Sequence, residues 1–284
     1  MQLVTQLEED SLIKIGIHQS HYHYEYTKTL EKIFEGNKVI VFDDISLAND
    51  LDLDILFVNT IQNLPMDWVK FIGFNPDCKK VLTIHEINSE ICYNPILRKF
   101  DAINVTYKPM RWYLRSHNIY SGPIFTLPYL LHEKKYPNKS DMYVFPGKIE
   151  YFRRDYEKTL EYLPRGEEVM ILGEPMGKYG KKIIDKFSMN RRVHVSTERV
   201  PEEEYQKHLQ DCKGIISVLK NPTRGVNRIT KEWYGKTKIF SAYFEAIKYG
   251  KELITNVAVS DINYLDYKKD KVQNYFNMIM ERFL

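Results

Sequence analysis

The feature that most constrains the fold is an alternation of short apolar runs with segments of helical periodicity along nearly the whole chain. Short apolar runs bounded by turn residues are typical of strands buried in a parallel sheet, with helices in the connections. In the first half, the runs predict strands at 12–18, 38–42, 54–58, 81–85, 101–106 and 124–127. The segments between most of them predict helices at 25–34, 66–71, 90–99 and 110–117. The first half is therefore predicted to be a parallel α/β sheet covered on both faces.

A polar, proline-bearing segment at 132–141 interrupts this alternation and is predicted to be a linker. The alternation then restarts, with strands predicted at 142–145, 168–172, 193–195, 214–219 and 253–255. Helices are predicted at 155–162 and 180–187, from 201 onward, and in the stretch that ends at Gly250. The tail carries an apolar stripe typical of an amphipathic helix, formed by Val272, Tyr275, Phe276, Ile279, Met280 and Phe283. The predicted domains are 1–133 and 134–265, followed by a helix at 266–284.

Composition fits this plan and excludes several function classes. The 284 residues are enough for two domains, and 43% hydrophobic with 28% charged residues describes a soluble globular protein. A net charge of +3 is too small to argue for a nucleic-acid partner. No apolar run approaches the roughly 20 residues that span a bilayer.

The cysteines and the first residues bear on location. Cys78, Cys92 and Cys212 are widely separated, so they form no metal-ligand cluster and suggest a reducing compartment. The acidic residues at 8–10 interrupt any secretory signal sequence. A cytoplasmic location is expected.

The stretch 235–256 carries the strongest functional signal. Its apolar residues fall at helical spacing, Gly250 suits the left-handed end of a helix, and 253–255 predicts a short buried strand. Helix N-termini favour phosphate groups. The residues expected at that end are Gly235, Lys236, Thr237, Lys238 and Ser241. Farther along, the carboxylate of Glu245 can accept hydrogen bonds from ribose hydroxyls.

The segment Phe244–Ile254 resembles the donor-site helix of GT-B glycosyltransferases, especially those of family 4. Glu245 matches the second glutamate of the family's Glu-x7-Glu motif, whereas the first falls at Thr237, and Glu252 replaces the usual proline. Residues 201–217 resemble the family's preceding helix and strand. The resemblance implies two Rossmann-like doubly wound domains that face each other across a cleft. It also implies a C-terminal helix that crosses back onto the N-terminal domain.

The activity that this resemblance implies is transfer of a sugar from a nucleotide-diphosphate sugar to an unidentified glycan, lipid or protein acceptor. The implied transfer is retaining and needs no metal or cofactor. By resemblance, His85 orients the sugar, and Arg153 or Arg154 with Lys238 stabilises the leaving diphosphate. The remaining implied donor-binding residues are Gly147, Lys148, Gly173, Lys220, Ser241 and Glu245.

Other interpretations stay open. The basic residues from 220 to 238, opposed within that loop only by Glu232, suit either a phosphate or an acidic surface. The cluster His18, His21 and His23 is weak support for a metal site. Gln19–Ser20 stands where the family usually has a glycine-rich turn, so the turn in this chain is a candidate for contact with the acceptor. Residues 107–108 and 111–113 could rest on a membrane as a peripheral contact. A degenerate nucleotide-sugar-binding or partner subunit and a sugar-nucleotide epimerase are the alternative functions.

Overall fold

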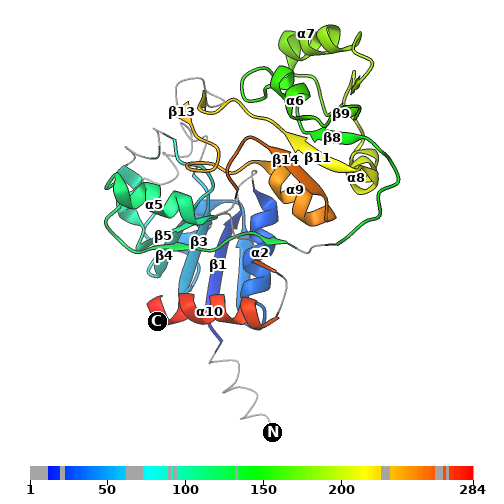
Figure 1. The fold of residues 1–284 in the computed structure, drawn as a ribbon. Coiled ribbons are helices and arrows are strands. Elements are labelled where there is room, and N and C mark those ends of the chain that lie inside the picture. The colour runs from blue at the N-terminus through cyan, green and yellow to red at the C-terminus, as the bar shows by residue number, and fades with distance from the viewer. Residues whose placement is uncertain are drawn as a thin grey trace. The chain divides into compact units, whose positions relative to one another are not determined.

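The computed structural model describes residues 12–19, 23–61, 73–88, 91, 95–131, 134–224, 231–259, 265–266 and 269–283. The chain divides into two compact units. Unit 1 comprises Met1–Leu130 and Ile262–Leu284, and unit 2 comprises Leu131–Asp261. Each unit is built around its own parallel sheet (Figure 1).

Unit 1 contains a six-stranded sheet in the order β2-β1-β3-β4-β5-β6. The strands are β1 (Lys14–Gln19), β2 (Lys38–Phe42), β3 (Ile55–Asn59), β4 (Lys79–Ile84), β5 (Ala102–Val105) and β6 (Ile124–Thr126). Every neighbouring pair is parallel. Because β2 and β3 flank β1 on opposite sides, the winding reverses between β1 and β3. The carboxyl ends of these two strands form what we call the unit-1 switch point, a position at which open α/β sheets bind ligands.

The helices of unit 1 are α2 (Tyr24–Ile33), α5 (Lys108–Ser116) and α10 (Lys269–Phe283), with 3-10 turns η1 (Ile45–Asn49) and η2 (Pro95–Lys99). The predicted apolar stripe of α10 is confirmed: Ile279 is fully buried, and Phe276 packs on Phe34 with ring centroids 6.1 Å apart. The side chain of Phe283 lies outside the described residues. Just before this helix, β15 (Leu265–Asp266) pairs with β7 (Leu130–Leu131). The chain thus returns to unit 1 after completing unit 2, with α10 drawn in red beside the blue strands in Figure 1.

Unit 2 contains a five-stranded sheet in the order β10-β9-β8-β11-β14. The strands are β8 (Tyr143–Pro146), β9 (Val169–Leu172), β10 (Val193–Val195), β11 (Gly214–Ser217) and β14 (Glu252–Thr255). The helices are α6 (Tyr156–Tyr162), α7 (Gly177–Phe187), α8 (Glu202–Asp211) and α9 (Ser241–Tyr249), and a short antiparallel pair joins β12 (Thr223–Arg224) to β13 (Lys231–Glu232). The strand order reverses between β8 and β11, and the carboxyl ends of these strands form the unit-2 switch point.

Three local predictions need comment. The predicted helix at 66–71 lies outside the described residues. Of the predicted helix at 90–99, the described part forms a 3-10 turn at 95–99 and one helical residue, Ile91. The strand at 253–255 was predicted to be buried, which is wrong: β14 pairs only with β11 in this sheet, so it is an edge strand with partly exposed side chains.

The end of α9 follows the prediction. Gly250 adopts the left-handed conformation with φ 61° and ψ 39°, and its N–H donates to the carbonyl oxygens of Ala246 and Ile247. Glycine adopts this conformation without the steric penalty of a Cβ atom. In the described part of the chain, no helix is both long and apolar enough to cross a bilayer.

Candidate functional site

His85 follows β4 and lies beside the unit-1 switch point. Its side chain is buried, and both ring nitrogens have partners. Nε2 lies 2.7 Å from Oδ1 of Asn59, the last residue of β3, and Nδ1 lies 2.9 Å from the hydroxyl of Tyr129. Two residues that the sequence did not single out therefore fix the position of this predicted site residue.

The partners also fix where the protons lie. The side-chain nitrogen of Asn59 donates to the His23 carbonyl oxygen and to Thr27 Oγ1, each at 3.1 Å. The Asn59 oxygen must then accept from His85 Nε2–H, which leaves Nδ1 of a neutral ring to accept from the Tyr129 hydroxyl. Since that hydroxyl proton is used, the Tyr129 oxygen accepts from His23 Nδ1–H across 3.1 Å. One arrangement of protons satisfies the whole group, which we call the His85 network.

The His85 network keeps its histidine neutral. The rings of His23 and His85 stack with centroids 3.8 Å apart and planes inclined by 7°, and Tyr26 meets His85 edge-on at 5.0 Å. Burial lowers the pKa of His85 well below its usual range, and the neighbouring His23 lowers it further. His85 can therefore orient a neighbour through hydrogen bonds, but it does not supply positive charge near neutral pH.

A second layer of hydrogen bonds supports the network. Asn104 donates to the Tyr26 hydroxyl at 2.7 Å and to Thr83 Oγ1 at 3.2 Å, and the Tyr26 hydroxyl donates to the Leu127 carbonyl oxygen at 2.7 Å. Directly after β3, Thr60 is buried with φ 81°. A β-branched residue rarely adopts this conformation, and such strain gathers at functional sites. The carboxyl edge of this sheet is therefore a rigid polar surface rather than ordinary core.

The described members of the histidine cluster, His18 and His23, belong to no group of possible metal ligands. His18 Nε2 lies 3.2 Å from the Asp43 carbonyl oxygen, His23 belongs to the His85 network, and His21 lies outside the described residues. Across the described ranges, no three His, Cys, Asp or Glu side chains gather in a way that could hold a metal ion.

Arg154 occupies the unit-2 switch point. Its Nη1 donates to the Pro146 carbonyl oxygen at 2.7 Å at the end of β8, and its backbone forms a bridge with Leu219, two residues beyond β11. The guanidinium lies over the Phe145 ring, 5.0 Å from its centroid. Its Nε is buried and has no hydrogen-bond partner within the described part of the chain. An arginine anchored through one nitrogen in this way keeps donors available for a phosphate.

Gly147 and Gly173 lie next to Arg154 at the ends of β8 and β9. Gly147 has φ 97°, and a Cβ atom there would overlap Arg154 Nη2. A Cβ atom on Gly173 would overlap the Gly147 carbonyl group. Only glycine allows the two turns to approach so closely. The side chain of Lys148 is exposed beside them.

Arg153 and Lys238 are already paired with carboxylates. Arg153 Nε binds Glu150 Oε1, and Lys238 Nζ lies 3.3 Å from Glu232 Oε2. Glu150 is 5% exposed and Glu232 is 2% exposed, so neither carboxylate is solvated. The sequence shows Glu232 as the only acid within the basic loop, and the fold adds Glu150 from another segment. The charges of Arg153 and Lys238 are therefore balanced before any phosphate arrives.

The prediction that α9 begins near Gly235 is wrong. Residues 235–237 form a turn, and the helix begins at Ser241 after Phe240, whose backbone is extended with φ −118° and ψ 146°. Thr237 is buried, and its Oγ1 accepts from Trp233 N–H at 3.0 Å while its own N–H donates to the Trp233 carbonyl oxygen at 2.9 Å. Such side-chain bonds to the backbone compete with helix formation. Of the five residues expected at the N-terminus of α9, only Ser241, which is exposed, lies in its first turn.

The charges of Glu245 and Arg154 both act on the hydroxyl of Tyr205, which belongs to α8. Burial raises the pKa of Tyr205, the charge of Glu245 raises it further, and that of Arg154 lowers it. Lys220 is directed elsewhere: its Nζ donates to the Tyr151 carbonyl oxygen at 2.8 Å and lies 3.6 Å from the centroid of that ring. The structure thus gathers Gly147, Gly173 and Arg154, and it directs the side chain of Lys220 to Tyr151.

Comparison with known proteins identifies the fold of the chain but does not assign the chain to a family. No family model matches the sequence. Pre-mRNA-splicing factor SYF1 of Dictyostelium discoideum is 23% identical over 308 residues that cover 96% of this chain and 35% of that protein. The chain therefore spans about a third of the length of this relative, and an identity of this size does not assign it to a family.

Two solved structures share the fold. AviGT4, a glycosyltransferase involved in avilamycin A biosynthesis, superposes with a TM-score of 0.59 at 11% identity, covering 93% of this chain and 88% of its own. A glycosyltransferase from Rickettsia africae ESF-5 gives a TM-score of 0.52 at 11% identity, covering 95% and 89%. The predicted α/β fold class is confirmed: the chain has the GT-B fold, with two Rossmann-like units. Membership in family 4, and a cleft between the two domains, stay predictions.

Proposed function

We propose that this protein is a glycosyltransferase that uses a nucleotide-diphosphate sugar as its donor. The observation that carries the proposal is the gathering of Gly147, Gly173 and Arg154 at the unit-2 switch point. A glycine turn lets a phosphate approach the backbone closely, and an arginine with unused donors complements a diphosphate. The fold shared with two glycosyltransferases supports the same reaction class.

In this proposal the diphosphate rests against the turn at Gly147–Lys148 and the guanidinium of Arg154. Glu245 accepts hydrogen bonds from the ribose, and the exposed Ser241 meets the donor at the start of α9. As the bond from the anomeric carbon to the diphosphate breaks, Arg154 stabilises the charge that develops on the leaving oxygen. Arg153 and Lys238 can bind the diphosphate only after they leave their carboxylate partners. Lys220 can bind it only after its side chain leaves Tyr151. We propose a retaining transfer without metal or cofactor.

His85 acts in this scheme as a positioning residue. Its two ring nitrogens hold Asn59 and Tyr129, so a sugar hydroxyl reaches it only by replacing one of these partners. The half-buried His23 presents the other face of the same network. We infer that the sugar or the acceptor contacts the partly exposed edge of the network, such as His23. His85 holds that edge in position through its hydrogen bonds.

The decisive experiment measures both binding and turnover. The full chain is mixed with a panel of nucleotide-diphosphate sugars, and the melting temperature, donor hydrolysis and sugar transfer are recorded. A donor that raises the melting temperature and is consumed supports the proposal. Glu245→Gln should weaken binding of that donor by about 1–3 kcal/mol because a charged hydrogen bond to the ribose is lost. Glu203→Gln, an exposed change on α8, is the matched control and should bind as the parent does. Equal donor affinity in both variants would remove Glu245 from the site.

A second candidate is a catalytically degenerate nucleotide-sugar-binding or partner subunit. Three observations favour it: Thr237 holds a turn where the related motif has a glutamate, and Arg153 and Lys238 are both neutralised. If one nucleotide raises the melting temperature but no donor is consumed with any acceptor, this candidate is preferred. An isomerised donor without transfer would indicate an epimerase.

The acceptor, the cytoplasmic location and a peripheral membrane contact belong to the same proposal. The support for location is the sequence: widely separated cysteines and a chain of soluble composition. No nucleic-acid partner is proposed, since the net charge of +3 gives no basis for one.

A further inference from the structure

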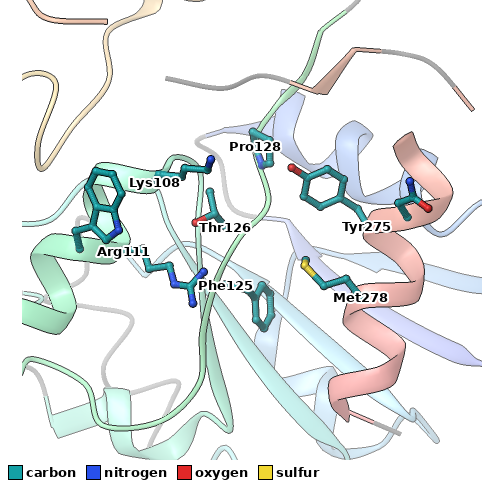
Figure 2. Close-up of a pocket in the computed structure, with 9 residues that line it drawn as sticks. Lys108, Arg111, Phe125, Thr126, Pro128, Tyr275 and Met278 are labelled. Atoms are coloured by element: carbon teal, nitrogen blue, oxygen red, sulfur yellow. The ribbon is translucent and has the colours of Figure 1, made fainter. Parts of the chain in front are cut away.

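A pocket of about 460 Å³ lies within unit 1, between α5, the end of β6 and α10. It shares no lining residue with the His85 network. Its volume is in the range of sites that hold small molecules. Figure 2 shows Lys108 and Arg111 on one side, Tyr275 and Met278 of α10 on the other, and Phe125 between them.

The walls of this pocket are largely apolar. Phe125 is almost fully buried and packs in the same core as Ile279 of α10. Tyr275 and Met278 are partly buried against that core. Rigid aromatic rings beside a flexible thioether provide a surface that accommodates an apolar body of variable shape. The pocket can therefore remove a hydrocarbon or an aromatic group from water.

One wall of the pocket carries two cationic side chains, Lys108 and Arg111. Neither Lys108 nor Arg111 forms an ion pair with any residue in the described ranges. Lys108 is the first residue of α5, and that helix has no acidic residue in its first turn and no side-chain cap. Helix N-termini favour anions, so a lysine there is unfavourable by itself and adds to the same positive potential. This arrangement points to a negatively charged group in the ligand.

Thr126 supplies an unused hydrogen-bonding group on the adjoining wall. Its Oγ1 is buried and has no hydrogen-bond partner among the residues that the structure describes. Buried hydroxyl groups normally have partners, and an orphan lowers stability. A ligand oxygen placed between Thr126 and the two cations would satisfy it.

We propose that this pocket binds an amphiphilic anion, with a phosphate or carboxylate head between Lys108, Arg111 and Thr126 and an apolar body against Phe125, Tyr275 and Met278. Arginine and phosphate or carboxylate match as paired donors and acceptors. The shared chemistry is that of soluble alkyl or prenyl phosphates and of anionic lipids. The inference goes beyond the proposed glycosyl transfer and does not depend on it.

The first test uses decyl phosphate below its micelle concentration, with decanol and inorganic phosphate as partial ligands, in titration calorimetry on the full chain. We expect decyl phosphate to bind at least about tenfold more tightly than either partial ligand, because only it uses both the cations and the apolar wall. Decyl phosphate binding no better than decanol would overturn the proposal. The assay needs no sugar donor, so its failure and that of the proposed function are separate outcomes.

Variants locate the site. Lys108→Ala combined with Arg111→Ala should weaken decyl phosphate binding about tenfold or more, whereas Arg115→Ala, an exposed change on the same helix outside the pocket, should leave it unchanged. Asn274→Trp, at an exposed lining position, should block the pocket while keeping both cations. Thr126→Val should raise the melting temperature yet weaken binding, a combination that a purely structural threonine would not give. Equal affinity in the double variant and in Arg115→Ala would overturn the assignment.

Vesicles then distinguish the sources of the anion. The pocket would be assigned to a lipid by two results together. The protein binds phosphatidylglycerol vesicles but not phosphatidylcholine vesicles, and decyl phosphate releases it from them. Binding of decyl phosphate without vesicle binding would assign it to a soluble ligand. Vesicle binding that persists in Asn274→Trp and is not displaced would place the anion on the surface and overturn the proposal.

Discussion

The two switch points have the same topology but different chemistry. In unit 1 the carboxyl end of β3 carries Asn59, which belongs to a neutral, buried set of rings and amides whose hydrogen bonds satisfy one another. In unit 2 the ends of β8 and β11 meet Arg154, with two further cations paired to buried carboxylates nearby. The doubly wound sheet therefore sets where polar groups gather, and the residues that end its strands set what they can bind.

This difference predicts that the two units are destabilised by different changes. Unit 1 relies on hydrogen bonds among uncharged groups, so protonation should disturb it. Unit 2 relies on charge balance, so removing one charge should disturb it most. The same contrast fits the proposed function, because a neutral surface suits sugar hydroxyls whereas a cationic one suits a diphosphate.

The largest effect is expected for Glu232→Ala in unit 2. Lys238 would keep its charge in a largely buried position, where its side chain is 15% exposed, without its carboxylate partner. Breaking a buried ion pair from one side costs about 3–5 kcal/mol. Urea unfolding followed by tryptophan fluorescence should show this loss in the free energy of unfolding.

Two controls sharpen that result. Glu157→Ala breaks the exposed pair with Lys186 and should leave the free energy of unfolding nearly unchanged. Glu232→Ala combined with Lys238→Met should recover most of the loss, because no buried charge is left. A single variant as stable as its parent would mean that unit 2 does not depend on charge balance.

A smaller effect is expected in unit 1 when the pH is lowered, because a neutral group there would gain a charge. The folded-state pKa of His85 lies below that of the unfolded chain, about 6.5. The unfolded chain therefore takes up the proton first as pH falls, so the stability from the neutral ring is present above pH 6.5 and is lost below it. The slope is at most about 1.4 kcal/mol per pH unit for one proton.

Urea unfolding from pH 8 to pH 5 tests this expectation. His85→Gln should flatten the slope below pH 6.5, and His117→Gln, an exposed change in the same unit, should not. His23 stacks on His85, so His23→Gln is measured alongside. An unchanged slope in His85→Gln would show that the network tolerates a charged ring.

An effect of similar size is expected in the turn before α9. Thr237→Val removes the oxygen that accepts from Trp233 N–H and should cost about 1–3 kcal/mol, because the amide is left without a partner. Thr237→Ser keeps the hydroxyl and should cost less. Hydrogen exchange at the Trp233 amide is the direct measurement, and equal protection in both variants would show that the hydroxyl does not hold this turn.

Much of the fold could be predicted because its signals are local. The apolar runs placed most strands within two residues, and the glycine at 250 marked the end of α9. The start of α9 and the exposure of β14 could not be predicted, since they depend on the Thr237 turn and on which strand lies at the edge of the sheet.

The candidate site was less accessible from sequence. The residues themselves could be named from the resemblance, but the partners of His85 come from other segments. Asn59 and Tyr129 meet His85 only because β3 lies beside β4 and because the chain beyond β6 passes near both. Glu150 balances Arg153 through a short-range contact that the sequence could have suggested, since the two are three residues apart. The polar residues that end apolar runs, such as Asn59, were the available signal.

The return of α10 to unit 1 has a consequence for how the chain matures. Unit 2 is one uninterrupted segment, whereas unit 1 needs residues on both sides of it to complete its core. During synthesis on the ribosome, unit 2 can reach its final form while the earlier segment still lacks the cover that Phe276 and Ile279 provide. The helix that completes the first sheet is therefore synthesised only after the whole of unit 2.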